Sequence, residues 1–414
     1  MFGVLVKYNF FMKKKVKVVF ITEQFSENMG YIANCLPRAL ARLGHEVHII
    51  TSTGNVYFRV PSAYEAIESF LGPPEVEAGE KELHGVTLHR LDYFLILGRI
   101  GLYGFKSLLQ KIQPDVVHAA DVVQPYLLQA ALYSKSLNYK YFIGCHETMS
   151  SFRLAGRWDK ISVEKMLYLA FKTYPGAFIS QFAEKCFPAT IDCKEVAVNY
   201  MGVPEEICKV APLGVDTSIF KPVNSANTID ERNTTRASLG YIDDDIVCIY
   251  TGKFTKAKSP LLLAKAIDKL KQLGHTEYKG LFLGAGVEKE KILSCENCKI
   301  IDFLPFPQLP KYYRAAEIGV WPRQESTSML DAAASALPII VNDTVKAVER
   351  CEGNGIMYKL DDVDDLVEKL LTLKDKDLRI ELGEVGRDKM QELFSWDKIA
   401  QERTLDYYEA LGIN

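Results

Sequence analysis

The chain has 414 residues, which is too long for one hydrophobic core and suits two domains. Hydrophobic residues make up 48% of it and charged residues 25%, the balance of a globular protein in water. The net charge of −3, with both signs mixed along the chain, excludes the basic face of a nucleic-acid-binding protein, and no apolar run is long enough to cross a bilayer.

The nine cysteines are scattered and odd in number, which indicates reduced thiols and a cytoplasmic protein. Cys295 and Cys298 form one CxxC pair, but without a second pair or nearby histidines it is a weak signal for zinc. We therefore predict no metal site.

The first eleven residues are apolar and precede Lys13–Lys15, whereas a secretory signal carries its positive residues first. Met12 stands directly before a strand-like run and reads as a natural start. We interpret residues 1–11 as an extension foreign to the native chain. The alternative is a segment that touches the inner face of a membrane.

The first half begins with a buried strand at 16–22, because its run is continuous and rich in β-branched residues. A polar loop containing Gly30 and an amphipathic helix at 32–43 follow. Later strands are predicted at 47–51, 86–91, 116–119, 141–145, 176–180 and 209–213, with a helix at 105–112.

The second half restarts with a buried strand at 246–251, after a polar segment at 224–236 that has no periodicity and is predicted to be a linker. Strands are predicted next at 279–283, 299–303, 318–322, 339–341 and 355–359, and helices at 261–273, 308–316, 363–371 and 396–411.

This order predicts an α/β protein of two doubly wound, Rossmann-like domains that face each other across a cleft at the carboxyl ends of their strands. The expected domains are 1–212 and 213–395. The helix within 396–414 has an apolar stripe and no following strand, so we expect it to return to the first domain.

The segment 303–343 is a strand, a polar loop, an Ala-rich helix and a second strand. The loop before the helix holds most of the polar residues, where free backbone N–H groups and the helix dipole favour a phosphate or a sugar hydroxyl. Asp331, one turn into the helix, is placed to accept hydrogen bonds from a ribose.

Several segments together resemble the family-4 glycosyltransferases of the GT-B fold, which are retaining enzymes with nucleotide-sugar donors. The resemblance covers nearly the whole chain from about Lys15. The matching segments are RALARLGHEVHIIT (38–51), PDVVHAAD (114–121), APLGVDTSIFKP (211–222), YTGKFTKAKSP (250–260), LGAG (283–286) and LDAAASALPIIVND (330–343).

The resemblance implies transfer of a sugar from a UDP- or GDP-sugar to a glycan, lipid or small-molecule acceptor. Lys253 and Lys258, after Gly252, match the family's basic pair and would bind the donor diphosphate. Their two charges would replace a divalent metal. The base is expected near Phe303 and Leu304, held by backbone groups.

The family's first acid has no match in register, because Arg323 stands eight positions before Asp331. In one interpretation the loop is shorter, so that Glu325 and the N–H groups of Ser326, Thr327 and Ser328 still reach the donor sugar. In the other, this part of the site has lost its function.

On the first domain, His146 matches the family's active-site histidine and would bind the transferred sugar; the alternative is a structural histidine. Asp121 either touches sugar or acceptor or caps the next helix. Gly30 lets the backbone approach the donor closely, or is an ordinary loop glycine. Arg153 and Arg157 either bind an anionic or lipid-phosphate acceptor or are solvated helix charges.

Two other functions share this fold. A sugar-nucleotide epimerase would use the donor without an acceptor, and a non-catalytic protein would bind the nucleotide without turnover. A Rossmann dehydrogenase is disfavoured because the first turn lacks G-x-G-x-x-G.

Overall fold

Long runs of buried apolar residues build both halves of the molecule, and each run becomes a strand that helices cover on two faces. The computed structural model describes residues 14–58, 68–149, 152, 154 and 157–413. They form two compact units. Unit 1 takes in the described residues up to 58, Leu71–Leu213 and those from Trp396 onward, and unit 2 consists mainly of Gly214–Ser395.

Unit 1 is built on a seven-stranded sheet in the order β3-β4-β2-β1-β7-β8-β9, parallel except for the antiparallel pair β3 and β4. Strands after β1 are added on one side of it up to β4, and later strands are added on its other side from β7 onward. The boundary between β1 and β7 is therefore the topological switch point of a doubly wound sheet. The strands are β1 (Lys17–Ile21), β2 (Glu46–Ser52), β3 (Gly79–Leu83), β4 (Val86–Leu91), β7 (Val116–Ala119), β8 (Lys140–Cys145) and β9 (Ala183–Pro188), with a separate hairpin of β5 (Tyr93–Ile96) and β6 (Arg99–Leu102).

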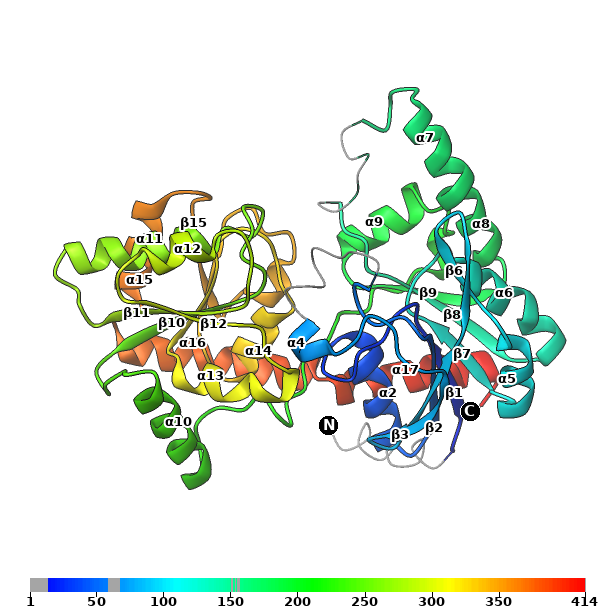
Figure 1. Cartoon of the computed structure of the whole chain (residues 1–414), viewed down its shortest axis with the longest axis horizontal. Helices are drawn as coiled ribbons and strands as arrows, with labels where there is room; N and C mark the ends of the chain where they lie inside the picture. Colours follow the sequence, from blue (N-terminus) through cyan, green and yellow to red (C-terminus); the bar gives the residue numbers. More distant parts are fainter. Residues whose placement is uncertain (1–13, 59–67, 150–151, 153, 155–156, 414) are drawn as a thin grey trace. The chain divides into compact units, whose positions relative to one another are not determined.

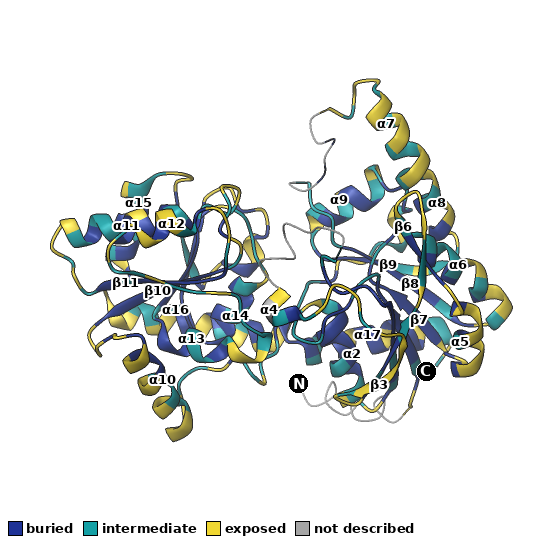
Figure 2. Cartoon of the chain, viewed as in Figure 1, coloured by how far each residue is buried: buried dark blue, intermediate teal, exposed yellow. Residues whose placement is uncertain are grey.

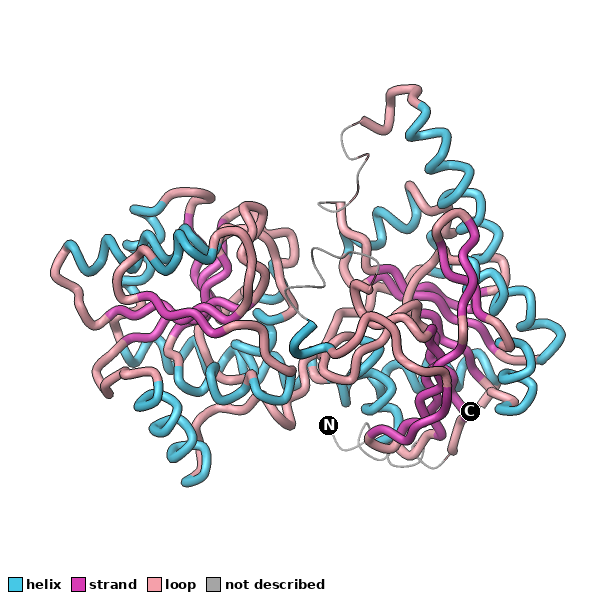
Figure 3. The backbone as a smooth tube through the Cα atoms, in the orientation of Figure 1, coloured by secondary structure: helices cyan, strands magenta, loops and turns pink. Residues whose placement is uncertain are grey.

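Helices cover this sheet, as the backbone tube in Figure 3 shows. They are α2 (Ile32–Arg42), α5 (Phe105–Ile112), α6 (Pro125–Leu137), α7 (Val163–Tyr168), α8 (Tyr174–Ser180), α9 (Ile191–Asn199) and α17 (Trp396–Leu411). A π-helical segment, Leu169–Thr173, joins α7 to α8 without a break, and a 3-10 turn spans Glu205–Ile207. The short helix α4 (Glu68–Leu71) lies between β2 and β3 in the chain.

The C-terminal helix α17 packs within unit 1, mainly against α2. Two buried polar contacts fix it: His45 Nε2 lies 3.0 Å from Thr404 Oγ1, and His118 Nδ1 lies 2.6 Å from Tyr407 Oη. At the surface, Arg42 donates to Asp397. The described part of the chain therefore begins and ends in the same unit (Figure 1).

Unit 2 is built on a six-stranded parallel sheet in the order β12-β11-β10-β13-β14-β15, with its switch point between β10 and β13. The strands are β10 (Ile246–Thr251), β11 (Tyr278–Leu283), β12 (Cys298–Ile301), β13 (Ile318–Trp321), β14 (Ile339–Asn342) and β15 (Gly355–Tyr358). The helices are α10 (Ala226–Ser238), α11 (Pro260–Gln272), α12 (Lys289–Leu293), α13 (Pro310–Ala315), α14 (Ser328–Ala334), α15 (Val363–Thr372) and α16 (Lys376–Lys389). Shorter turns are Phe306–Gln308, Val348–Arg350 and the π-helical Met390–Phe394.

Two sequence-based predictions in unit 1 are wrong. Residues 176–180 form the end of helix α8, and the last strand of the sheet is β9, just beyond it. Residues 209–213 form no strand. A five-residue apolar run does not distinguish a buried strand from a buried helical turn, which is how the first of these errors arose.

The predicted linker at 224–236 is also wrong, because helix α10 occupies it. Ser225 and Thr228 form a capping box at its start, where the Ser225 side chain accepts from the Thr228 N–H. The buried residues of this helix are Thr235 and Arg236 instead of an apolar stripe, and arginines attach the helix to the unit.

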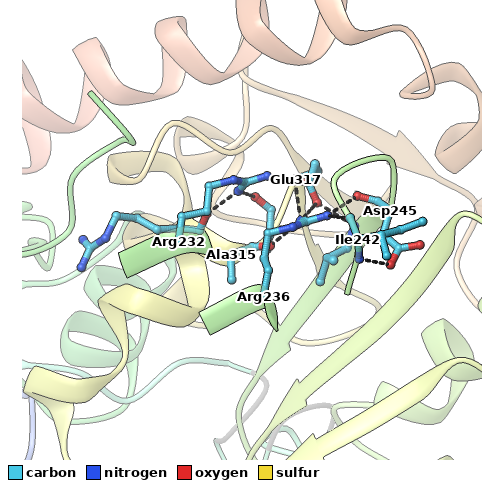
Figure 4. Close-up of polar contacts among 9 residues, drawn as sticks. Arg232, Arg236, Ile242, Asp245, Ala315 and Glu317 are labelled. Atoms are coloured by element: carbon cyan, nitrogen blue, oxygen red, sulfur yellow. Dashed lines mark hydrogen bonds and ion pairs between the residues drawn. The ribbon is translucent and has the colours of Figure 1, made fainter. Parts of the chain in front are cut away.

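Figure 4 shows this attachment. The Arg236 guanidinium is buried; it contacts both Glu317 carboxylate oxygens, at 3.0 and 3.1 Å, and donates to three backbone carbonyls. Arg232 pairs with the same carboxylate. Glu317 Oε2 also accepts from the Val247 N–H at 2.7 Å, which ties the network to β10.

Candidate active site

The switch point of unit 2 brings together several of the residues predicted to bind the donor. The loop after β10 carries Gly252, Lys253 and Lys258, and the loop after the neighbouring β13 carries 323–327. Because these loops leave adjacent parallel strands at the same edge, their side chains come together.

Glycines allow the loops after β10 and β11 to touch. Gly284 has φ +147°, and a Cβ there would lie 1.9 Å from the Gly252 carbonyl oxygen. Gly252 has φ +148° and donates its N–H to Leu283. Both positions therefore require glycine, and the backbone after β10 is held in one place.

The two lysines differ in their surroundings. Lys253 is exposed, whereas Lys258 is half-buried and donates from Nζ to the backbone carbonyl of Glu325 at 2.7 Å. Burial lowers the pKa of Lys258; the Glu325 carboxylate opposes this change, and the charges of Lys253 and Arg350 add to it. An anion placed here would relieve the repulsion among these cations.

Glu325 connects three loops. Its backbone oxygen accepts from Lys258, while carboxylate Oε1 accepts from the N–H groups of Lys346 at 2.6 Å and Ala347 at 3.0 Å. The carboxylate thus holds the loop after β14 against the loop after β13, and the residue stands next to the lysine predicted to bind phosphate.

Arg323 does not lie beside Lys258 as Glu325 does. Its guanidinium pairs with the Asp361 carboxylate and is exposed, and a second contact reaches the Lys256 carbonyl at 3.4 Å. This ion pair offsets a positive charge that would otherwise add to those of Lys253 and Lys258.

The turn before α14 is held by its own hydroxyl groups. Ser326 Oγ lies 2.7 Å from Ser328 Oγ, which also bonds to the Thr251 carbonyl at 3.2 Å and to Trp321 Nε1 at 3.1 Å. Thr327 is exposed and precedes the first turn of the helix. The turn is therefore anchored to the ends of β10 and β13.

Asp331 lies half-buried on α14. Burial raises the pKa of Asp331 well above its usual range, and the charge of Asp216 raises it further. Asp216, from the loop before α10, accepts from the N–H and the hydroxyl of Ser218. The residues predicted to contact the base, Phe303 and Leu304, lie half-buried in the loop after β12.

Unit 1 contains a pocket of about 90 Å³ at the carboxyl ends of β7 and β8. It brings together two predicted site residues, Asp121 from the loop after β7 and His146 from the loop after β8. Glu147 and Lys172 also line it and pair at 4.0 Å. The remaining lining residues are Val122, Val123, Gln124, Cys145 and Met201.

Both ring nitrogens of His146 are buried and have no hydrogen-bond partner among the described residues. Burial lowers the pKa of His146, with the Asp121 charge opposing and the Arg403 charge reinforcing this change. The imidazole is therefore neutral near pH 7, with one nitrogen that donates and one that accepts. Such a pair suits a sugar hydroxyl group.

The other residues predicted in unit 1 are less informative. Gly30 is half-buried in the loop between β1 and α2. Arg157 is exposed and lies 3.8 Å from Glu164. Arg153 lies outside the described residues, as does the N-terminal extension 1–11.

Four residues of these two sites were not predicted from the sequence. Arg350 is buried, and its guanidinium makes no hydrogen bond or ion pair within the described chain, yet its charge acts on Lys258. Asp216 lies near Asp331, and Glu147 and Lys172 line the pocket. Only Asp216, which lies in the segment 211–222, and Glu147, next to His146, had a nearby sequence signal.

In the part of the chain that the structure describes, no cluster of three or more His, Cys, Asp or Glu side chains is arranged to hold a metal ion. Over the same residues, no helix has the length and hydropathy to cross a membrane.

Comparison with known proteins decides the family. The family described as Glycosyltransferase Family 4 matches residues 35–219, and that described as Glycosyl transferases group 1 matches residues 245–376. The chain belongs to the family-4 glycosyltransferases. The first matched range falls mostly in unit 1, and the second falls in unit 2.

This glycosyltransferase is 24% identical over 431 residues to an uncharacterized glycosyltransferase of Methanocaldococcus jannaschii, covering 95% of this chain and 98% of that protein. Among solved structures, a glycosyltransferase from Rickettsia africae ESF-5 is similar with a TM-score of 0.69 at 15% identity, covering 97% of this chain and 100% of that one. Anabaena HepE in complex with UDP-glucose has a TM-score of 0.64 at 14% identity, covering 96% and 99%. These similarities show the GT-B fold.

Proposed function

We propose that this glycosyltransferase moves a sugar from a UDP- or GDP-sugar to a glycan, lipid or small-molecule acceptor, with retention of the anomeric configuration. The observation that carries the proposal is the cation cluster at the switch point of unit 2. Lys258 bonds to the Glu325 carbonyl, and the charges of Lys253 and Arg350 act on it.

In this proposal the cluster binds the donor diphosphate. As the glycosidic bond breaks, negative charge develops on the leaving nucleoside diphosphate, and fixed cations in a partly buried site stabilise it. We propose that these cations make a divalent metal unnecessary. The complex of Anabaena HepE with UDP-glucose supports a nucleotide-sugar donor for this fold.

Residues of the neighbouring loops and of α14 would make the remaining donor contacts. The Ser326–Ser328 turn and Gly252 would approach the phosphates and the sugar, Asp331 would accept from the ribose hydroxyls, and the loop of Phe303 and Leu304 would hold the base. Glu325 positions the loop after β14 through its two backbone bonds. Its neighbour Lys258 keeps it beside the diphosphate.

Neutral His146, with both nitrogens unpaired in the described chain, would bind a hydroxyl group of the transferred sugar. Asp121 shares its pocket and would contact the sugar or the acceptor. Gly30 would allow the β1–α2 loop close to the donor, and Arg157 would act on the acceptor side.

A thermal-shift screen of UDP-, GDP- and ADP-sugars tests the proposal, followed by product analysis of each stabilising donor. We expect one donor class to raise the unfolding temperature and to be hydrolysed slowly to nucleoside diphosphate and free sugar. The α-anomer of the sugar, seen by NMR before mutarotation, would support retention from an α-linked donor. Interconversion of donor sugars would indicate an epimerase, and binding without turnover a non-catalytic protein.

A further inference from the structure

A line of exposed apolar side chains runs along the continuous helix formed by α7, the π-helical segment and α8. We call it the α7–α8 stripe, and its exposed fractions range from 41% to 76%. Its members are Val163, Met166, Leu167, Phe171, Tyr174 and Phe178.

The stripe is one face of the helix, because its members recur every three or four residues over four turns. The turn before the helix extends it with Ile161, which is 93% exposed. Exposed apolar residues elsewhere, such as Ile242 and Val287, are mostly isolated in the chain; the exception is Leu95–Leu97 in the β5–β6 hairpin, a run of three residues that spans no helical face. A contiguous exposed apolar face is uncommon on a protein surface and indicates a docking surface.

Figure 2 shows the outer side of α7 coloured as exposed, and Figure 1 shows α7 extending beyond the sheet of unit 1. The helix therefore presents a convex apolar ridge. A protein partner would need a matching groove, whereas the boundary between lipid head groups and acyl chains accepts an apolar ridge directly.

The chemistry of the helix and of the turn before it fits a lipid surface. The stripe mixes aliphatic side chains with Phe and Tyr, the composition of helices that lie in the membrane interface. Arg157 and Lys160 are exposed in the preceding turn, where they suit anionic head groups. Asp159 in the same turn and Glu164 in the first turn of α7 are also exposed, so the attraction is modest.

The opposite face of the same helix lines the pocket that holds His146. Lys172 lies half-buried on that face, within the pocket and 4.0 Å from Glu147. One face of this helix therefore forms a wall of the proposed sugar-transfer pocket, and a partner bound to the stripe lies on its other face. A small soluble acceptor has no need of this apolar face.

We infer that the α7–α8 stripe docks on a lipid bilayer, so that the acceptor of the transfer is presented at a membrane surface. The part concerning the acceptor rests on the proposed function, whereas the docking itself does not.

Vesicle co-sedimentation of the full chain tests the docking. The probes are phosphatidylcholine vesicles and vesicles that also contain phosphatidylglycerol. The test variant is Leu167→Gln/Phe171→Gln/Tyr174→Gln, because Gln keeps helix propensity and removes the apolar surface. The matched control is Ile229→Gln/Ile380→Gln/Val385→Gln, three helical residues of unit 2 with exposed fractions from 43% to 49%.

We expect the wild type to bind, more strongly when phosphatidylglycerol is present. The test variant should bind vesicles at least about tenfold more weakly than the wild type, and the control should bind as the wild type does. The single change Phe171→Gln should lower binding in part. Circular dichroism and the unfolding temperature of each variant check that the chain still folds.

Three results would overturn the inference: a wild type that binds neither vesicle, a test variant that binds as the wild type does, or a control that loses binding equally. A wild-type dimer that the test variant converts to a monomer, measured by light scattering, would assign the stripe to a second copy of the chain. Nucleotide-sugar binding, measured in parallel, separates this failure from failure of the proposed function.

Discussion

At the residue scale, Asp331 lowers the stability of the folded chain near neutral pH and has a proposed role in donor binding. Its carboxyl keeps a proton in the folded chain at pH values where the unfolded chain has lost it, because its pKa is raised well above 3.8. The folded state then binds more protons, so the free energy of unfolding falls as pH rises through that window.

Asp331→Asn should therefore raise the unfolding temperature at pH 7 and leave it nearly unchanged near pH 4. A gain of about 1 kcal/mol corresponds to roughly 2–4 °C for a domain of this size. The same change should weaken binding of the nucleoside diphosphate, measured by calorimetry. A variant that is less stable at pH 7, or that binds as tightly as the wild type, would argue against this account of Asp331.

Variants of Glu325 and Arg323 distinguish the two interpretations of the loop before α14. Glu325→Gln should lower turnover at least tenfold, because it weakens two bonds to the loop after β14 beside Lys258. Arg323→Gln removes only an exposed ion pair with Asp361 and should change turnover by less than threefold, since such pairs contribute about 0–1 kcal/mol. Steady-state kinetics with the identified donor measures both. The reverse order would place Arg323, in the family register, at the donor.

At the element scale, α10 shows what the sequence did and did not reveal. The strands β1 and β10 were predictable, because buried parallel strands read as continuous β-branched runs. Helix α10 was not, since its stability comes from Arg232 and Arg236 reaching Glu317, 85 and 81 residues further along the chain. Likewise, nothing in the local pattern placed Arg350 near Lys258 or Lys172 beside His146.

Arg236→Ala should lower the free energy of unfolding of unit 2 by about 3–5 kcal/mol, because it leaves the nearly buried Glu317 without one of its partners. Urea denaturation followed by circular dichroism measures it. Arg387→Ala is the control, because Arg387 is half-buried in α16 and its side chain makes no hydrogen bond or ion pair within the described residues. Equal effects of the two changes would mean that the Figure 4 network does not hold α10 in place.

At the scale of the whole molecule, the chain crosses from unit 1 to unit 2 after Leu213 and returns at Trp396. The order of strands and helices predicted two α/β domains, and the sheet orders agree with that class. The return of the last helix to the first domain was expected from its apolar stripe, but the individual contacts of α17 were not, because His118 and Tyr407 are separated by 289 residues.

Tyr407→Phe should lower the stability of unit 1 by about 1–3 kcal/mol, because it leaves buried His118 Nδ1 without its partner. Leu405→Ala, at a residue 38% exposed on the same helix, should cost less. Thermal unfolding of both variants measures the difference. If Leu405→Ala costs as much as Tyr407→Phe, the buried hydrogen bond does not hold α17 on unit 1.

The most direct test of the proposed function is the affinity of the nucleoside diphosphate for Lys258→Ala compared with Lys256→Ala. The two lysines lie in the same loop, but only Lys258 is half-buried and bonds to Glu325; Lys256 is exposed. Isothermal calorimetry should show binding weakened by roughly 1.5–3 kcal/mol, about 10- to 150-fold, for Lys258→Ala and nearly unchanged for Lys256→Ala. Unchanged affinity in Lys258→Ala, or an equal loss in both variants, would contradict a diphosphate site at the switch point of unit 2.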